Sequence, residues 1–255
     1  MATQNKNKLK RLFKELQPGQ VVTSSWLEEL GISRNLKKYY LESGWLEPVG
    51  RGAYKKPGDV VEWQGALNAL QKQEKKEIHV GGLSALTMQG LSHYSRLSYE
   101  TLYLYGPSNT KLSKWFLDYN WKYNIFHKQT HFLPDNLAIK ELDVRSVPVL
   151  VSTPERAILE CLLLAPKKID LTECYQILEG LVNLKPKLLS ELLINCKSIK
   201  VKRVFLYMAE KANHHWFQFL KTDGINLGSG NRMLVENGVY NAKYLISIPG
   251  DLDEL

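Results

Sequence analysis

The sequence predicts a mixed α+β chain in which a small basic N-terminal unit precedes a larger, nearly neutral remainder. Residues 1–58 hold 11 Lys and Arg against 5 Glu, a net charge of +6 out of +8 for the whole chain. Helical and strand periodicities alternate along the remainder, and the part after residue 152 is mainly helical. With 44% hydrophobic and 24% charged residues, the 255-residue chain is long enough for two folded domains and lacks the bias of a disordered protein.

Composition also argues against several other classes of protein. No apolar stretch approaches the roughly 20 residues of a membrane span, and the basic N-terminus lacks the apolar segment of a secretory signal. Cys161, Cys174 and Cys196 lie 13 and 22 residues apart, which is neither a disulfide framework nor a zinc-ligand spacing. We therefore expect a cytoplasmic protein with reduced core thiols, no membrane contact, no metal and no cofactor.

Two helices are predicted at the start of the chain. The first has one apolar stripe and ends at Pro18-Gly19. Its stripe consists of Leu9, Leu12, Phe13 and Leu16. The second helix starts at Ser24-Ser25, where Ser25 and Glu28 have the spacing of a capping box, and it ends at Gly31.

A third helix over 34–43, capped by Ser33 and ended by Gly44, follows after a very short connector. Strands over 45–49 and 53–55 then flank a Gly50-Arg51-Gly52 turn, which places Arg51 at the tip of a basic hairpin. Two helices joined by a tight turn and followed by such a hairpin are typical of a winged helix-turn-helix, which binds DNA. The alternative is a winged helix used for protein contacts.

If the unit binds DNA, the polar and basic residues at the start of the third helix are expected to contact the bases. This group comprises Arg34, Asn35, Lys37 and Lys38. The wing and its exit supply three phosphate contacts, which are Arg51, Lys55 and Lys56.

The remainder is predicted to contain both helices and strands. The whole chain is predicted to consist of a winged domain at 1–58, a helical linker at 59–76 and a C-terminal domain at 77–255. Asp59 is expected to cap a helix that ends near Lys75, with Val60 on its apolar side. Helices are expected at 83–89, 156–164, 172–182, 186–193, 199–212 and 215–220, and strands at 101–105, 121–128, 138–145 and 147–151. Ser152 to Glu155 offer a capping box, and Asn237-Gly238 predicts a closing hairpin between 232–235 and 243–248.

No arrangement in the sequence assembles an enzyme from spacing alone. The chain lacks the phosphate-binding, zinc-protease and serine-hydrolase motifs. The Gly228-Ser229-Gly230 turn with Arg232 can cradle an anion, although a plain turn explains it as well. A basic cluster at 197–203 is expected to point outward from a helix whose other face is core, as a binding patch or as a solvated surface. Glu155 and Arg156 are expected to be structural.

Several blocks along nearly the whole chain resemble the AbiEi-type antitoxins of bacterial abortive-infection, type IV toxin–antitoxin systems. The N-terminal unit carries VVTSSWLEELGIS (21–33) and VGRGAYK (49–55). The remainder carries GLSALTMQGL (82–91), LYLYGP (102–107), STPERAILE (152–160), EGLVNLKPKLL (179–189), CKSIKVKRVFLY (196–207) and LGSGNRMLV (227–235). Because the winged unit is shared by many regulators, the distal blocks make the resemblance specific.

The resemblance implies an autorepressor that binds inverted repeats in its own promoter. Such repeats fit either a dimer or two monomers bound cooperatively, so we expect a monomer or weak dimer. It also implies an antitoxin that counters a nucleotidyltransferase toxin without needing a stable complex. The candidates for that antitoxin surface are Lys200, Lys202, Arg203, Ser229 and Arg232. An alternative is that the larger domain is an enzyme that handles nucleotide or phosphate and modifies the toxin or its substrate.

Overall fold

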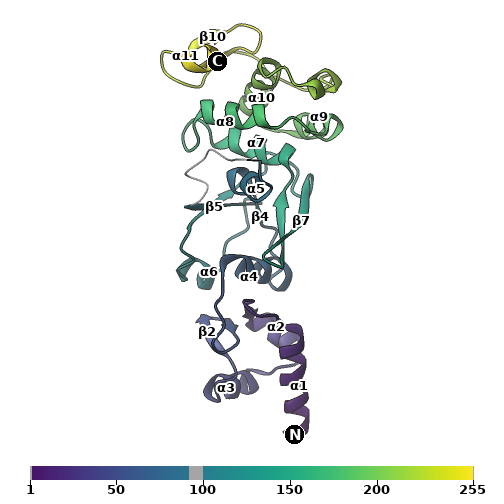
Figure 1. Cartoon of the computed structure of the whole chain (residues 1–255), viewed down its shortest axis with the longest axis vertical. Helices are drawn as coiled ribbons and strands as arrows, with labels where there is room; N and C mark the ends of the chain where they lie inside the picture. Colours follow the sequence, from purple (N-terminus) through teal and green to yellow (C-terminus); the bar gives the residue numbers. More distant parts are fainter. Residues whose placement is uncertain (1, 92–99, 255) are drawn as a thin grey trace. The chain divides into compact units, whose positions relative to one another are not determined.

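The computed structural model describes residues 2–91 and 100–254, which divide into two compact units (Figure 1). Unit 1 comprises Met1–Ile78, Asn109–Ile125 and Glu141–Leu150, and unit 2 comprises His79–Ser108, Phe126–Lys140 and Val151–Leu255. The division therefore follows packing and not chain order. None of the helices in the described ranges has both the length and the apolar character that crossing a membrane requires.

Unit 1 begins with the predicted three helices and hairpin, together with a short strand that the sequence analysis missed. The helices are α1 (Ala2–Glu15), α2 (Ser24–Glu29) and α3 (Arg34–Glu42), and the strands are β1 (Val22–Thr23), β2 (Glu47–Gly50) and β3 (Ala53–Lys55). The strands form an antiparallel sheet in the order β1-β3-β2. This element order, with a hairpin directly after α3, is the one expected of a winged helix-turn-helix.

One hydrophobic cluster holds these elements together. Leu12 of α1, Leu16 just after it, Leu27 of α2, and Leu36 and Tyr40 of α3 are all buried in it. The predicted apolar stripe of α1 is thus confirmed, because its inner residues face this cluster while Phe13 and Leu9 pack at its edge. Burial of these side chains holds α3 against α1 and α2.

The next part of unit 1 differs from the prediction at its start. The helix begins at Trp63, as α4 (Trp63–Asn68), and continues as a π-helical turn, η1 (Ala69–Gln73). Asp59 does not cap it, because the Asp59 carboxylate accepts a hydrogen bond from the Gly19 amide at 3.2 Å. Val60 is 81% exposed, so the prediction that it lies on the apolar face is wrong.

A five-stranded sheet has the order β6-β5-β4-β8-β7. Its members are β4 (His79–Val80), β5 (Thr101–Gly106), β6 (Asn124–Gln129), β7 (Ile139–Val144) and β8 (Val147–Ser152). In unit 2, β4 pairs antiparallel with β5 and parallel with β8. The four longer strands were predicted, but β4 has only two residues and gives no detectable alternation. A short helix, α6 (Lys114–Asp118), was also missed.

Helices make up most of the rest of unit 2, as predicted. They are α5 (Gly82–Met88), α7 (Pro154–Leu164), α8 (Leu171–Gly180), α9 (Pro186–Asn195), α10 (Ile199–Lys211) and the 3₁₀ turn η3 (His215–Phe219). Cys161 in α7, Cys174 in α8 and Cys196 just after α9 are buried and unbridged, as expected of core thiols. The capping box predicted at 152–155 is wrong, because Thr153 makes no side-chain cap bond and Ser152 bonds Glu160 instead.

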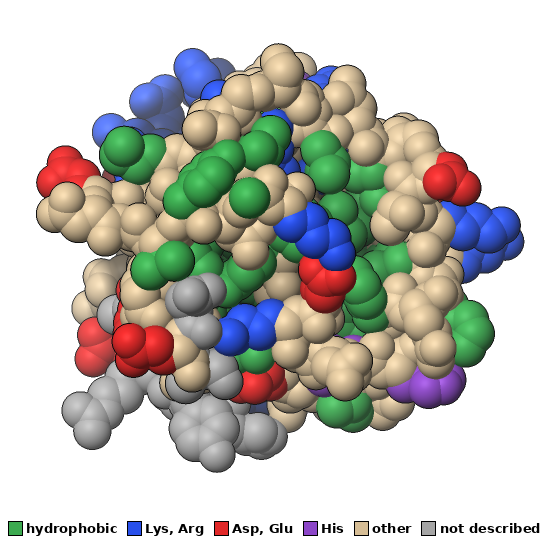
Figure 2. All heavy atoms as spheres, turned by 90° about the horizontal axis from the view of Figure 1, so that it is seen from above, with side chains coloured by type: hydrophobic (Ala, Val, Ile, Leu, Met, Phe, Trp, Pro, Cys, Tyr) green, Lys and Arg blue, Asp and Glu red, His purple; other side chains and the backbone are tan. Residues whose placement is uncertain are grey.

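The C-terminal sheet is not the predicted hairpin. Its strands are β9 (Arg232–Met233), β10 (Val239–Asn241) and β11 (Ile246–Ile248), in the order β10-β11-β9. β9 lies parallel to β11, and β10 is the antiparallel partner. A short helix, α11 (Gly250–Glu254), ends the described chain. Figure 2 shows hydrophobic side chains at the surface of the end that carries the C-terminus, and Met233 and Tyr240 of this sheet are exposed.

Candidate nucleic-acid interface

The helix-turn-helix is built by local hydrogen bonds at both ends of the turn. Thr23 caps α2, with its hydroxyl accepting from the Trp26 amide at 3.3 Å, so the predicted cap by Ser25 is wrong. Gly31 has a φ of 74°, the left-handed conformation expected after a helix C-terminus. Ser33 caps α3 as predicted, with its hydroxyl accepting from the Leu36 amide at 3.3 Å. The turn therefore fixes the position of the first residues of α3.

Three of the four predicted base-reading side chains are presented to solvent. Arg34, Asn35 and Lys38 are exposed on α3, whereas Leu36 faces the core. Lys38 lies 3.6 Å from Glu42 in an exposed pair, which holds the lysine weakly. These polar groups follow directly on the capped N-terminus of the helix, where a recognition helix presents its side chains.

Lys37 differs from its neighbours because it is half-buried against the rest of the unit. Its ammonium donates to the Ser24 hydroxyl at 2.9 Å and lies 5.6 Å from the centre of the Tyr54 ring. Ser24 in turn lies 3.4 Å from the Tyr54 hydroxyl. Lys37 thus joins α3 to α2 and to the hairpin, and Ser24 is a residue that the sequence analysis did not single out.

The hairpin presents Arg51 but holds Lys55 and Lys56 in internal contacts. Arg51 is exposed in the turn, next to Gly52 with a φ of 87°. Lys55 lies 3.1 Å from the Glu47 carboxylate and donates to the Asp59 carbonyl at 2.7 Å. The Lys55 hydrogen bond, followed by that of the Gly58 amide, lowers the pKa of Glu47. Lys56 donates to the Phe13 carbonyl at 3.3 Å and lies over the Phe13 ring.

The candidate residues of unit 2 are placed differently from the outward patch that was expected. Lys202 is 3% and Arg203 is 1% exposed, so the prediction that they point outward from α10 is wrong. Lys200 is half-buried and donates to the carbonyls of Leu163, at 2.9 Å, and Ala165. The expectation rested on a helix with one buried face, but α10 is buried over nearly its whole circumference.

Arg203 is instead joined to the glycine turn that the sequence analysis treated separately. Its guanidinium donates to the carbonyls of Leu227 at 2.8 Å, Gly230 at 2.6 Å and Leu245 at 3.1 Å. Ser229 and Arg232 are exposed next to this anchor. The structure thus brings Arg203 to the 228–232 turn, and the exposed members of the five candidates are Ser229 and Arg232.

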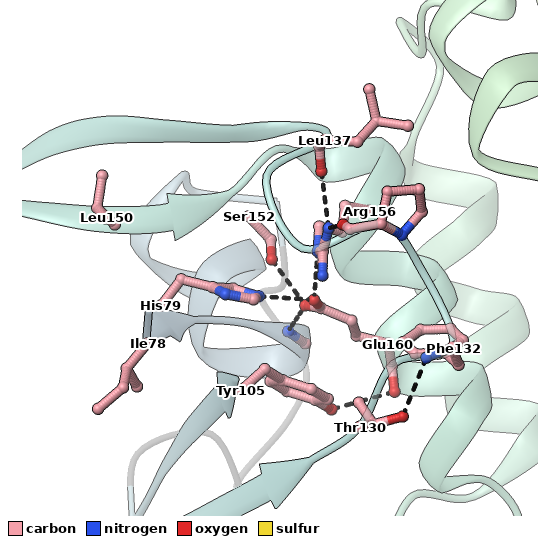
Figure 3. A network of polar contacts seen from close by, with 12 residues as sticks. Ile78, His79, Tyr105, Thr130, Phe132, Leu137, Leu150, Ser152, Arg156 and Glu160 are labelled. Atoms are coloured by element: carbon pink, nitrogen blue, oxygen red, sulfur yellow. Dashed lines mark hydrogen bonds and ion pairs between the residues drawn. The ribbon is translucent and has the colours of Figure 1, made fainter. Parts of the chain in front are cut away.

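Figure 3 shows a second polar network in unit 2, centred on the buried Glu160. The Glu160 carboxylate bonds His79 Nε2 and Arg156 Nε, both at 2.8 Å, and accepts from Ser152 at 2.7 Å and the Gly82 amide at 2.9 Å. Arg156 also donates to two backbone carbonyls, those of Pro134 and Leu137. Because His79, Arg156 and Glu160 are all buried, the network ties β4, β8 and α7 together, and the structural role expected for Arg156 is confirmed.

The first three helices and the hairpin that follows them have the element order of a helix-turn-helix with a wing. Two family models match the chain, one for the AbiEi antitoxin N-terminal domain at residues 5–97 and one for the AbiEi antitoxin transcriptional regulator at residues 99–249. The chain therefore belongs to the AbiEi antitoxin family of transcriptional regulators of type IV toxin–antitoxin systems.

Comparison with solved structures supports the fold independently. The chain is similar to the crystal structure of the RV2827C protein from Mycobacterium tuberculosis, with a TM-score of 0.59 and 15% identity, over 93% of this chain and 88% of that one. At this identity the likeness concerns the fold alone. No curated protein sequence matches the chain.

Proposed function

We propose that the chain represses its own operon by binding inverted repeats in the promoter through α3 and the hairpin, which acts as the wing. The observation that carries this proposal is the exposed group of Arg34, Asn35 and Lys38 at the capped start of α3, together with the exposed Arg51 of the hairpin. Arginine reads guanine and asparagine reads adenine through paired hydrogen bonds in the major groove. Lys38 and Arg51, at the tip of the wing, are suited to contact DNA phosphates.

Lys37, Lys55 and Lys56 have a different role in this proposal. Each makes the internal contacts described above, which hold α3 and the wing in place. We therefore assign specificity to Arg34 and Asn35, and direct phosphate contacts to Lys38 and Arg51. The three internally bonded lysines position these groups and add to the positive potential of the face.

Binding of the full-length protein to its own upstream DNA tests the proposal. Arg34→Ala is expected to weaken binding by about 1–3 kcal/mol and to relax preference at one base pair. Lys38→Ala is expected to weaken binding to all sequences alike and to lower the salt slope by about one. Lys10→Ala, which removes an exposed cation of α1, is the matched control. Equal, sequence-independent losses in all three variants would contradict the assignment of α3 as the reader.

We further propose that unit 2 counters a nucleotidyltransferase toxin through the exposed turn that carries Ser229 and Arg232. Arg203 supports that turn from within, and Lys200 and Lys202 hold α10 in place. Arg232→Glu is expected to abolish rescue from the toxin while the melting temperature and promoter binding stay unchanged. Full rescue by the folded variant would remove this turn from the antitoxin surface.

The enzymatic alternative depended on the basic cluster at 197–203 and on the glycine turn. Lys202 and Arg203 are buried, and Arg203 is already bonded to three carbonyls, so this pair offers no open phosphate site. We therefore favour a regulator and antitoxin that is not an enzyme.

A further inference from the structure

A hollow of about 620 Å³ lies within unit 1, beside the wing. One side is formed by the wing turn with Arg51 and by the start of α2 with Ser24. The lining also includes Glu74 and residues of α6, among them Lys114 and Asp118. The hollow is therefore bounded partly by a segment, residues 109–125, that lies far from the winged helix in the sequence.

Helix α6 is held against the wing by a close backbone approach. A Cβ atom added at Gly50 would lie 2.9 Å from Trp115 Cβ and 3.1 Å from Trp115 Cα. Trp115 Nε1 donates to the Glu74 carboxylate at 2.8 Å, and the Ser113 hydroxyl donates to its other oxygen. Glycine at position 50 thus allows α6 to approach, and Glu74 fixes its first residues.

Two cations, Arg51 and Lys114, and two acids, Glu74 and Asp118, line the hollow, and the two cations are the groups able to bind an anion. Among the described residues, neither Arg51 nor Lys114 has a hydrogen-bond or ion-pair partner, and both side chains are exposed. Glu74 is already bonded by Ser113 and Trp115 and lies 3.5 Å from Lys76. Asp118 is the remaining acid of the lining. Lys37 adds positive charge nearby, because its ammonium bonds Ser24.

The hollow also shares residues and contacts with both elements of the proposed interface, α3 and the wing. Ser24 forms part of the lining and is bonded to Lys37 of α3, while Arg51 of the wing forms part of the same lining. Hydroxyls and unpaired cations are the groups that commonly contact DNA phosphates.

We propose that this hollow receives a backbone phosphate of the bound DNA, and that Lys114 of α6 is a phosphate contact supplied from outside the winged helix. The proposal rests on the proposed DNA-binding function and extends its contact surface to residues 109–125. Lys114 contacts the phosphate together with Arg51 and carries no sequence information.

The test compares Lys114→Ala with Lys111→Ala in the full-length protein, by measuring affinity for the upstream DNA over a series of salt concentrations. Lys111 is an exposed lysine of the same segment that does not line the hollow. Lys114→Ala is expected to lower the slope of log affinity against log salt by about one, with base preference unchanged. Lys111→Ala is expected to match the wild type. Equal slopes in the two variants and the wild type would overturn the proposal.

A second variant tests whether α6 acts through its place on the wing. Gly50→Ala forces Trp115 away, so Lys114→Ala is expected to change the slope little in that background. Additive effects of the two substitutions, in a protein that still melts cooperatively, would contradict a shared phosphate site. If Gly50→Ala does not fold, the pair of lysine variants decides the question.

Arg34→Ala separates failure of this inference from failure of the proposed function. Weakened binding with Arg34→Ala but not with Lys114→Ala would leave the DNA-binding function intact and remove the hollow from the interface. A wild-type protein without preference for its upstream DNA would remove both.

Discussion

Arg203 carries its guanidinium into the interior of unit 2 and has carbonyl oxygens as its acceptors. Those of Leu227, Gly230 and Leu245 come from two separate stretches of chain, so a single side chain orders the turn that presents Ser229 and Arg232. The planar fork of arginine suits such divergent acceptors better than a lysine does. Lys200 and Lys202 of the same helix lack a planar guanidinium group.

Replacing Arg203 by methionine is expected to destabilise the protein by about 3 kcal/mol, because it removes three charge-assisted hydrogen bonds made by a buried side chain. Arg232→Met, which removes an exposed guanidinium from the same turn, is expected to leave stability unchanged. Urea unfolding of both variants measures the difference. A loss for Arg203→Met as small as that for Arg232→Met would show that the turn is ordered by other contacts.

Glu160 gives the protein a defined dependence on acid. Burial alone would raise the pKa of its carboxyl, but the charge and hydrogen bonds of His79, Arg156 and Ser152 lower it from 4.5 to about 2. A folded-state pKa below the unfolded value contributes stability above pH 4.5, and this contribution is lost as the pH falls toward about 2. From that shift, the contribution at neutral pH is about 3 kcal/mol.

Glu160→Gln is therefore expected to be less stable than the wild type at pH 7, and the difference is expected to shrink as the pH falls below 4.5. Unfolding by urea at a series of pH values measures this. Glu191→Gln, which changes an exposed carboxylate, serves as the control and is expected to follow the wild type throughout. A difference between Glu160→Gln and the wild type that stays constant with pH would show that the loss comes from packing and not from charge.

The capped start of α3 links element stability to DNA binding. The Ser33 hydroxyl accepts from the Leu36 amide, and Arg34 and Asn35 lie within that first turn. Ser33→Ala is expected to cost about 1 kcal/mol of stability and also to weaken promoter binding, because the first turn frays. Ser33→Asn keeps an acceptor at the cap and is expected to restore stability.

Circular dichroism and binding to the upstream DNA measure the two effects of the cap. If Ser33→Ala lost stability but bound DNA like the wild type, the first turn of α3 would not be the part that reads bases.

Elements with strong periodicity and the cap of α3 by Ser33 could be predicted from the sequence, whereas two other predicted caps failed because their side chains bond distant residues. The helices and the hairpin of the N-terminal unit follow from Leu and Tyr spacing and from Gly31 and Gly44. Asp59 was expected to cap a helix, but its carboxylate bonds Gly19, forty positions earlier. Ser152 similarly bonds Glu160, because burial of that carboxylate demands donors. The parallel pairing of β9 with β11 depends on tertiary packing that a local turn signal does not contain.

In the candidate site, too, side-chain exposure could be predicted from the sequence but side-chain contacts could not. The exposed positions of Arg34, Asn35 and Lys38 follow from helix periodicity around Leu36 and Tyr40. The internal bonds of Lys55 and Lys56 do not, since Asp59 and Phe13 are brought to them by the fold. Burial of Lys202 could not be predicted either, because a basic residue beside an apolar stripe normally faces solvent.

In the whole molecule, segments that are far apart in the sequence pack into the same unit. Unit 1 combines the first 78 residues with two later segments, 109–125 and 141–150. Residues 59–76 are bonded to the last of these segments: Asn68 donates to the Pro148 carbonyl at 2.8 Å, and the Gln71 side chain accepts from the Leu150 amide at 3.0 Å. The segment predicted to be a linker thus supplies side chains that form hydrogen bonds with backbone groups of β8.

Two truncations test what this arrangement means for dividing the protein. A chain of residues 59–255 is expected to melt cooperatively and to protect against the toxin without binding the promoter. A chain of residues 77–255 is expected to be several kcal/mol less stable, because it lacks the buried Trp63, Leu67 and Leu70, each contributing about 1.5–3 kcal/mol. It also leaves the backbone groups of Pro148 and Leu150 without their partners. Since total stability is about 5–15 kcal/mol, this loss is expected to reduce protection as well. Thermal melting and toxin rescue measure both chains, and equal melting temperatures would show that residues 59–76 are dispensable for the fold of the rest.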